Sequence, residues 1–197
     1  MKSSETAVIF IEFQNEFCKE GGKLYDIVKE SLATTPALKN AERLLAGARE
    51  KGCLVIHCPF VLDADWVDEH TVCGLLGNLG QGSVFAPGTW GVEIIDELSP
   101  VSGEPMVAGK RSISGFTGTN LEAILHEHGV KNVAICGFLT NICVQATAWG
   151  AYDLGFKTRI ITEASVATTA ANQSYVEAEI CPMLGGTLTV EEFLESV

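Results

Sequence analysis

The chain has few positive charges, and this shortage excludes one class of partner. Lys and Arg total 13 against 25 Asp and Glu, which gives a formal net charge of −12. A strongly acidic chain repels nucleic acid and anionic membrane surfaces. We therefore expect a small-molecule substrate, and neither a nucleic-acid nor a membrane partner.

Long apolar runs and paired cysteines are also missing. No apolar run approaches the roughly 20 residues of a membrane-spanning helix. The start of the chain, MKSSETAVIFIEF, has one lysine and an apolar run too short for a signal peptide. The 7 cysteines include no CxxC pair, which favours reduced thiols over a disulfide framework. We expect a cytoplasmic protein.

Several motifs that bind cofactors or carry catalysis are absent. The sequence contains no P-loop and no GxSxG elbow, and the GxxG in CGLLGNLGQG neither follows a strand nor predicts a helix. Carboxylates gather in residues 63–70, but His70 has no second histidine nearby, which disfavours a metal site. We expect no cofactor and no metal.

Short apolar runs alternate with amphipathic helical patterns along the rest of the chain. The runs are nearly continuous and rich in Val and Ile, as in parallel strands that are covered on both faces. They comprise residues 7–12, 54–59, 105–110, 132–137 and 157–162, with 186–190 as a sixth. Helical patterns over 37–52 and 118–129 each end at a glycine. The alternation predicts one α/β domain over residues 1–197 with a doubly wound parallel sheet.

The least regular segment is the Gly-rich stretch 63–89. It can cover the strand ends as a lid, form an oligomer contact, or be a plain surface loop.

Three reactive side chains lie at the ends of predicted strands: Glu12 and Lys110 are the last residues of two of them, and Cys143 follows a third. Sites in doubly wound sheets form beyond the carboxyl ends of the strands, so these side chains are expected to meet. A helix start and a nearby ammonium would lower the pKa of the Cys143 thiol. A carboxylate could take the thiol proton and later protonate a leaving amine. The alternatives remain a core cysteine, a helix-capping carboxylate and a solvated lysine.

The 4 histidines do not suggest a better site. His57 falls within a predicted strand and is interpreted as a core residue with a satisfied hydrogen bond. His126 and His128 come near the end of a predicted helix, where positive charge suits the helix dipole. His70 belongs to the irregular segment.

Four stretches resemble the isochorismatase-like (cysteine hydrolase) family in order and spacing, and together they span nearly the whole chain. They are VIFIEFQNEF, FAPGTWGVEIIDEL, VAGKRSISGFTGTNLEAIL and VAICGFLTNICVQATAWGAYDLGF. The resemblance implies a three-layer α/β/α sandwich with a six-stranded parallel sheet of order 3-2-1-4-5-6 (Rossmann-like). Members of this family are commonly homo-oligomers. Its nicotinamidases bind a metal in the segment that here contains the single His70, which disfavours that activity.

The resemblance also implies roles for individual residues. Cys143 matches the nucleophile and Lys110 the lysine of the family's triad, while Glu12 stands where the family usually has aspartate. The amides of Leu139 and Cys143 would form the oxyanion hole, beside a cis peptide bond at Phe138–Leu139. Glu16 also replaces an aspartate. The candidate substrate-binding residues are Gln14, Phe17, Trp90, Phe116 and Phe138.

These features favour a hydrolase that cleaves an amide or ureido C–N bond through a thioester on Cys143. One alternative is enol-ether hydrolysis of the isochorismatase type, with Glu12 as the general acid. A second alternative is an inactive family member that serves as an interaction protein, which the Glu12 replacement favours. The sequence does not identify the substrate.

Overall fold

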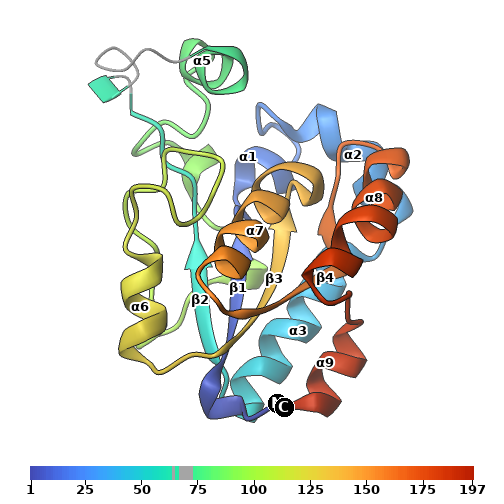
Figure 1. Cartoon of the computed structure of the whole chain (residues 1–197). Coiled ribbons are helices and arrows are strands. Elements are labelled where there is room, and N and C mark those ends of the chain that lie inside the picture. Colours follow the sequence, from blue (N-terminus) through green and yellow to red (C-terminus); the bar gives the residue numbers. More distant parts are fainter. Residues whose placement is uncertain (64, 67–72) are drawn as a thin grey trace.

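A computed structural model of the chain describes residues 1–63, 65–66 and 73–197. Within this part of the chain, four strands form one parallel sheet in the order β2-β1-β3-β4. They are β1 (Thr6–Ile11), β2 (Leu54–Cys58), β3 (Asn132–Phe138) and β4 (Lys157–Val166). Because all the pairs are parallel, the four carboxyl ends lie at one edge of the sheet, at the top in Figure 1.

Helices connect and cover these strands (Figure 1). The α-helices are α1 (Asn15–Cys18), α2 (Tyr25–Thr34), α3 (Ala37–Lys51), α5 (Gly74–Gln81), α6 (Leu121–Glu127), α7 (Gln145–Asp153), α8 (Ala170–Tyr175) and α9 (Val190–Ser196). Shorter 3-10 segments are η1 (Ser3–Glu5), η2 (Trp90–Val92), η3 (Asp96–Leu98) and η6 (Cys181–Leu184). The π-helical turns are η4 (Thr140–Val144) and η5 (Val176–Ile180).

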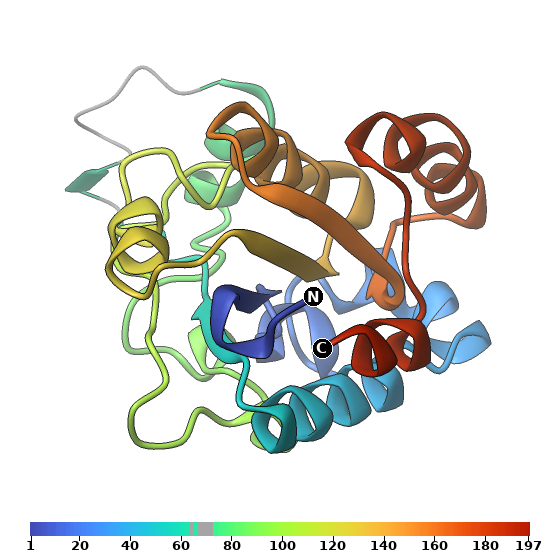
Figure 2. The same ribbon diagram turned by 60° about the horizontal axis from the view of Figure 1, so that its bottom comes forward.

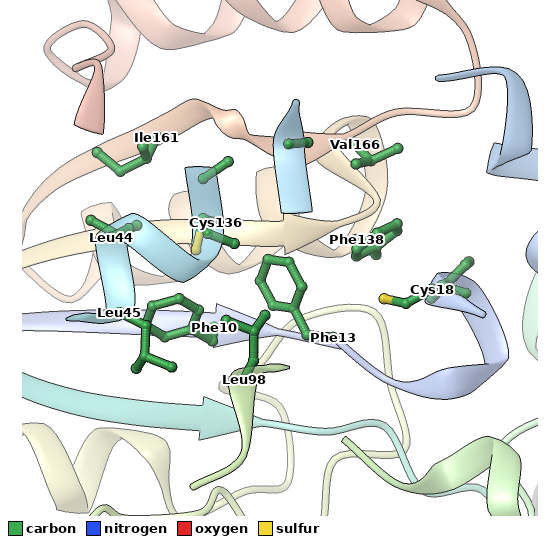
Figure 3. Packing of buried hydrophobic residues seen from close by; sticks show 14 of the residues in the cluster. Phe10, Phe13, Cys18, Leu44, Leu45, Leu98, Cys136, Phe138, Ile161 and Val166 are labelled. Atoms are coloured by element: carbon green, nitrogen blue, oxygen red, sulfur yellow. The ribbon is translucent and has the colours of Figure 1, made fainter. Parts of the chain in front are cut away.

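The sheet is buried on both faces, as its continuous apolar strands predict. Alternate side chains of β1 enter two different cores: Phe10 packs with residues of α3 and α9, and Ile9 with residues of α6 and α7. Figure 2 shows α3 and α9 on one side of the sheet and α7 on the other. Figure 3 shows the first of these cores, where Leu44 and Leu45 of α3 lie near Phe10.

The expected strand over residues 105–110 is present only as a single parallel bridge between Met106 and His57 of β2. Two features keep this segment from forming a longer ladder. Pro105 has no N–H to donate, and Gly109 adopts a left-handed φ of 82° that turns the chain. Its position beside β2 still matches the expected strand order.

The expected sixth strand, residues 186–190, is likewise reduced to one parallel bridge, between Thr187 and Ile160 of β4. Gly186 has a φ of 101°, and Thr189 already caps α9 with its side chain. Few extended residues remain between them. The described residues therefore form a sheet of four strands, and the expected count of six is not confirmed.

The helix predicted over 37–52 is confirmed as α3, which ends at Gly52 in a left-handed conformation with φ 73°. The helix predicted over 118–129 is shorter and corresponds to α6. The expectation that the GxxG in segment 63–89 starts no helix is wrong, because α5 begins there. Its glycines weaken helix propensity, but Leu79 is buried and Leu76 packs against the core, and this packing compensates.

Gly137 brings β1 and β3 close together immediately before the site. It pairs with Ile11 and has a φ of 129°, where a side chain would be strained. A Cβ at this position would collide with the carbonyl oxygen of Ile11. Because glycine has no side chain, β1 and β3 can approach closely here, and this brings together the chain segments that follow the two strands.

Candidate active site

Glu12 and Lys110 form a buried ion pair at the carboxyl edge of the sheet. Lys110 Nζ lies 2.5 Å from Glu12 Oε1, and the two residues are only 1% and 2% exposed. The ammonium also donates to the Ser112 carbonyl at 2.7 Å and lies 4.4 Å from the centre of the Phe60 ring. Its charge is thus compensated from several sides.

The ion pair keeps Lys110 charged despite its burial. Loss of water alone would lower the pKa of this lysine, but the negative charge of Glu12 and its hydrogen bond with the ammonium oppose that effect, and the pKa of Lys110 is raised. Lys110 therefore acts as a fixed positive charge next to Glu12.

Glu12 directly follows β1 in an unusual backbone conformation. Its φ is 55°, a left-handed value that is uncommon for glutamate. The Glu12 amide donates to the Cys58 carbonyl at 3.1 Å, and its carbonyl accepts from the Gln14 amide at 2.8 Å. These bonds to both sides hold the carboxylate at the strand end, in contact with Lys110.

Cys143 completes the group from the π-helical turn η4, between β3 and α7. Its thiol donates a hydrogen bond to the Glu12 carboxylate and accepts one from the Leu139 amide. A π-helical turn inside a helix is often found at functional sites. The peptide bond between Phe138 and Leu139 is cis, at the position that the family resemblance implies.

The environment of Cys143 raises its pKa well above the ordinary value. Burial is the largest cause and the Glu12 charge adds to it, while Lys110 and the Leu139 amide act in the opposite direction. The expectation that the helix start and Lys110 lower this pKa is therefore wrong for the resting site. Cys143 is only 6% exposed, and the charge of Lys110 is already compensated by Glu12.

A cavity of about 50 Å³ lies next to the thiol. Four of the predicted site residues line it, namely Glu12, Phe17, Leu139 and Cys143. The other lining residues are Leu24, Ile27, Phe60, Leu75, Leu79, Phe85, Ile113 and Ile142. All of these are apolar, and sequence analysis missed them because they resemble ordinary core residues.

The other predicted substrate-binding residues are not among those that line this cavity. Phe138 lies behind it, fully buried and stacked on Phe17 at 5.2 Å between ring centres. Gln14 is also fully buried, and its side chain bonds the backbone of Phe60 and the Val92 carbonyl. Gln14 thus links the segments that follow β1 and β2.

Trp90 and Phe116 also lie away from the cavity lining. The Trp90 residue is 49% exposed in η2, and its carbonyl accepts a hydrogen bond from the Asn15 side chain. Phe116 packs against the core on the α7 side of the sheet. The structure therefore brings together the predicted catalytic group but only Phe17 of the five predicted substrate-binding residues.

Glu16 positions one wall of the cavity. This carboxylate is 3% exposed and accepts hydrogen bonds from the backbone amides of Lys23 at 2.7 Å and Phe85 at 3.2 Å. Phe85 has a left-handed φ of 57° and packs on Phe17. Glu16 thus holds Phe85 in a conformation that aromatic residues rarely adopt.

His57 has the structural role expected of it. It is 1% exposed, and its Nε2 lies 3.0 Å from Glu104 Oε2. Burial lowers the pKa of His57, which favours the neutral ring. Burial alone would raise the pKa of Glu104, but bonds from Arg49, the Val101 amide and His57 lower it to about 2.

The described residues contain no group of three or more His, Cys, Asp or Glu that could hold a metal ion. Asp68 and His70 have the spacing of an Asp-x-His pair, and both lie outside the described residues. The expectation of no metal therefore stays a prediction.

A larger cavity, of about 390 Å³, lies elsewhere, among α2, α8 and the end of β4. Its lining includes Thr34, Glu163 and Gln173 but none of the three residues of the ion pair and thiol. Of these three residues, Glu12 and Cys143 line the smaller cavity.

A thiol, a carboxylate and an ammonium at the carboxyl edge of a parallel α/β sheet are typical of hydrolases that use cysteine. The isochorismatase domain model matches residues 6–192, and the chain therefore belongs to the isochorismatase family of hydrolases.

Several known proteins are similar to this chain in sequence or in structure. The chain is 31% identical to ureidoacrylate amidohydrolase RutB of Rhizobium rhizogenes over 169 residues, which cover 79% of this chain and 68% of that protein. It matches the structure of a cysteine hydrolase from Pseudomonas syringae pv. phaseolicola with a TM-score of 0.87 and 26% identity, covering 99% of this chain and 93% of the other. An isochorismatase family protein from Desulfovibrio vulgaris gives a TM-score of 0.84 at 25% identity, covering 98% and 97% of the two chains.

No helix in the described part of the chain is both long enough and apolar enough to cross a membrane.

Proposed function

We propose that this protein is a cysteine hydrolase that cleaves the C–N bond of a small amide or ureido compound. The observation that carries the proposal is the hydrogen bond from the Cys143 thiol to a Glu12 carboxylate that is itself paired with Lys110. Nucleophile and base are thus in contact before substrate binds. The similarity to an amidohydrolase supports the same reaction class.

Attack on the substrate begins with proton transfer from the Cys143 thiol to Glu12. The sulfur then bonds to the carbonyl carbon, and the carbonyl oxygen becomes an oxyanion. The Leu139 amide, which points at the sulfur in the resting site, and the Cys143 amide can donate to this oxyanion. When the intermediate collapses, the C–N bond breaks and Glu12 gives its proton to the leaving nitrogen, which leaves a thioester.

Water completes the cycle. Glu12 takes a proton from the water molecule, whose oxygen attacks the thioester carbon. The C–S bond breaks, the acid product leaves, and Glu12 returns the proton to Cys143. One amide and one water are thereby converted into an acid and an amine.

Lys110 holds a positive charge beside Glu12 throughout these proton transfers. Because the thiol has a raised pKa, it is protonated at rest, and deprotonation depends on the neighbouring carboxylate rather than on a free thiolate. The ammonium also offsets the negative charge that passes from Glu12 to the sulfur and then to the oxyanion.

The test compares Cys143→Ala and Glu12→Gln with wild type on a panel of small amides, ureas and isochorismate. The proposal predicts that Cys143→Ala loses at least about 10³-fold in kcat. Cys73→Ala, at an exposed cysteine, is the matched control and should keep wild-type rates. Substantial turnover of isochorismate by Cys143→Ala, with loss in Glu12→Gln, would instead support general-acid cleavage of an enol ether. A wild type inactive on the whole panel would support an interaction protein.

We further propose a cytoplasmic homo-oligomer, as the family resemblance implies. Light scattering after size-exclusion chromatography tests the oligomer, and a monomeric mass at micromolar concentration would contradict it.

A further inference from the structure

The cavity beside Cys143 offers a substrate apolar contacts almost everywhere. Phe17 and Phe85 pack on each other at 5.5 Å between ring centres and form part of its wall, with Leu139 and Ile142 near the thiol. Among the described residues that line the cavity, Glu12 carries the only charge. An apolar group of the substrate would therefore be bound by burial of its surface.

A carboxylate on the substrate would find no partner among these residues. The nearest cation, Lys110, already bonds Glu12 at 2.5 Å and the Ser112 carbonyl at 2.7 Å. A second carboxylate would lose its water without a compensating hydrogen bond and would also meet the like charge of Glu12. Both effects disfavour its binding.

The size of the cavity limits the group that it can hold. Its volume of about 50 Å³ is several times the roughly 10–15 Å³ of such cavity space that one water molecule needs, so a small group fits but a large ring system does not. Ile27 and Leu75, on α2 and α5, are 46% and 44% exposed and form its outer edge. A short branched chain can place its inner carbons near Phe17 and its far end between these two side chains.

We propose that the substrate is an amide whose acyl group is small, neutral and apolar, and that acyl groups bearing a carboxylate are rejected. The inference rests on the proposed amide hydrolysis and adds its substrate class. The reaction converts the amide and one water into the apolar acid and an amine, which is ammonia for a primary amide.

The first experiment uses two amides of nearly equal shape, 4-methylpentanamide and succinamate, in which a carboxylate replaces the terminal branched group. Ammonia release gives kcat/KM for each. We expect 4-methylpentanamide to be favoured by at least about 100-fold, because the site leaves the carboxylate unpaired. Equal values, or a preference for succinamate, would overturn the proposal.

A designed cation should change this preference. Ile27→Arg places a guanidinium at the outer edge of the cavity, where it can bind a carboxylate, and Ile27→Met is the matched neutral variant. We expect kcat/KM for succinamate to rise at least about 10-fold in Ile27→Arg and to stay low in Ile27→Met. No gain in a folded Ile27→Arg protein would contradict the placement of the acyl group at this edge.

A binding experiment separates failure of the pocket assignment from failure of the amide reaction. The aldehydes 4-methylpentanal and succinic semialdehyde can add reversibly to the Cys143 thiol and protect it from iodoacetamide at pH 8.5. Stronger protection by 4-methylpentanal supports the apolar pocket even if neither amide is hydrolysed, a result that would reject the amide reaction alone. Stronger protection by succinic semialdehyde would reject the apolar pocket even if amides are hydrolysed.

Discussion

Replacing Lys110 with methionine removes the ammonium of a buried ion pair and leaves the Glu12 carboxyl group buried without its partner. Methionine is similar in length, so the variant tests charge rather than packing. Glu12 is 2% exposed and cannot regain water without movement of its surroundings. We therefore expect Lys110→Met to destabilise the fold as well as to abolish turnover.

The size of the effect follows from the geometry of the pair. At the Nζ–Oε1 distance of 2.5 Å and an effective dielectric constant of about 20, the attraction is about 6–7 kcal/mol. The burial of both ions offsets much of this attraction, but removal of one partner leaves the desolvation cost of the other. Such losses amount to about 3–5 kcal/mol, and we expect the free energy of unfolding to fall by that amount at pH 7.

The chain contains a matched control for this prediction. Lys19 Nζ lies at the same distance of 2.5 Å from Glu97 Oε1, but these side chains are 36% and 43% exposed. Lys19→Met should lower the free energy of unfolding by less than about 1 kcal/mol, because water replaces the lost partner. The two ion pairs therefore differ in burial but not in the distance between their charged atoms.

Urea unfolding followed by circular dichroism measures both variants and the double variant Lys110→Met/Glu12→Gln. The double variant should recover at least half of the stability lost in Lys110→Met, because the stranded charge is gone. If Lys110→Met is as mild as Lys19→Met, or if the double variant recovers nothing, the assignment of the cost to an unpaired Glu12 is refuted.

Three further predictions concern other parts of the structure. Stability should fall as the pH drops below about 6.5, where the unfolded chain protonates His57 but the folded chain, with its lowered pKa, does not. Glu104 has a pKa of about 2 in the folded chain and of 4.5 when unperturbed, so the free energy of unfolding should fall further between pH 4.5 and pH 2. Urea unfolding at a series of pH values measures both effects, and Glu104→Gln should remove most of the loss in this second range. Iodoacetamide at pH 7 should label the exposed Cys73 faster than Cys143, whose pKa is raised, as mass spectrometry of labelled peptides would show; faster labelling of Cys143 would reveal an activated thiolate. Glu16→Gln should raise KM about 10-fold with a smaller change in kcat, because an amide group cannot accept from both backbone N–H groups; an unchanged KM in steady-state kinetics would contradict the positioning role of this residue.

The meeting of Glu12, Lys110 and Cys143 could be predicted because it depends on topology. Each residue follows a predicted strand or strand-like segment, and parallel strands end at the same edge of the sheet. No detail of side-chain packing was needed for that step.

The lining of the cavity could not be predicted in the same way. Ile27, Phe60 and Phe85 come from separate elements, and their side chains are of the types that fill any core. Trp90 and Phe116 are equally apolar in sequence, yet they face elsewhere. Which aromatic residues reach the thiol depends on loop conformations such as the left-handed φ of Phe85.

The pKa of Cys143 shows a second limit of the sequence. The helix and the lysine that were expected to lower it are present, but burial and the carboxylate dominate. The burial of one side chain depends on all the residues packed around it, and it cannot be predicted from the residues next to it in the sequence.

Gly137 restricts how this site can change in evolution. Any single substitution there adds a side chain that must push apart the segments carrying Glu12 and Leu139, so their spacing cannot drift by small steps at this position. The reach of the carboxylate can instead change through the length of the acidic side chain at position 12. The glutamate at position 12, one methylene longer than the aspartate usual in the family, is a change of this kind: it alters the reach of the base while the backbone frame stays fixed.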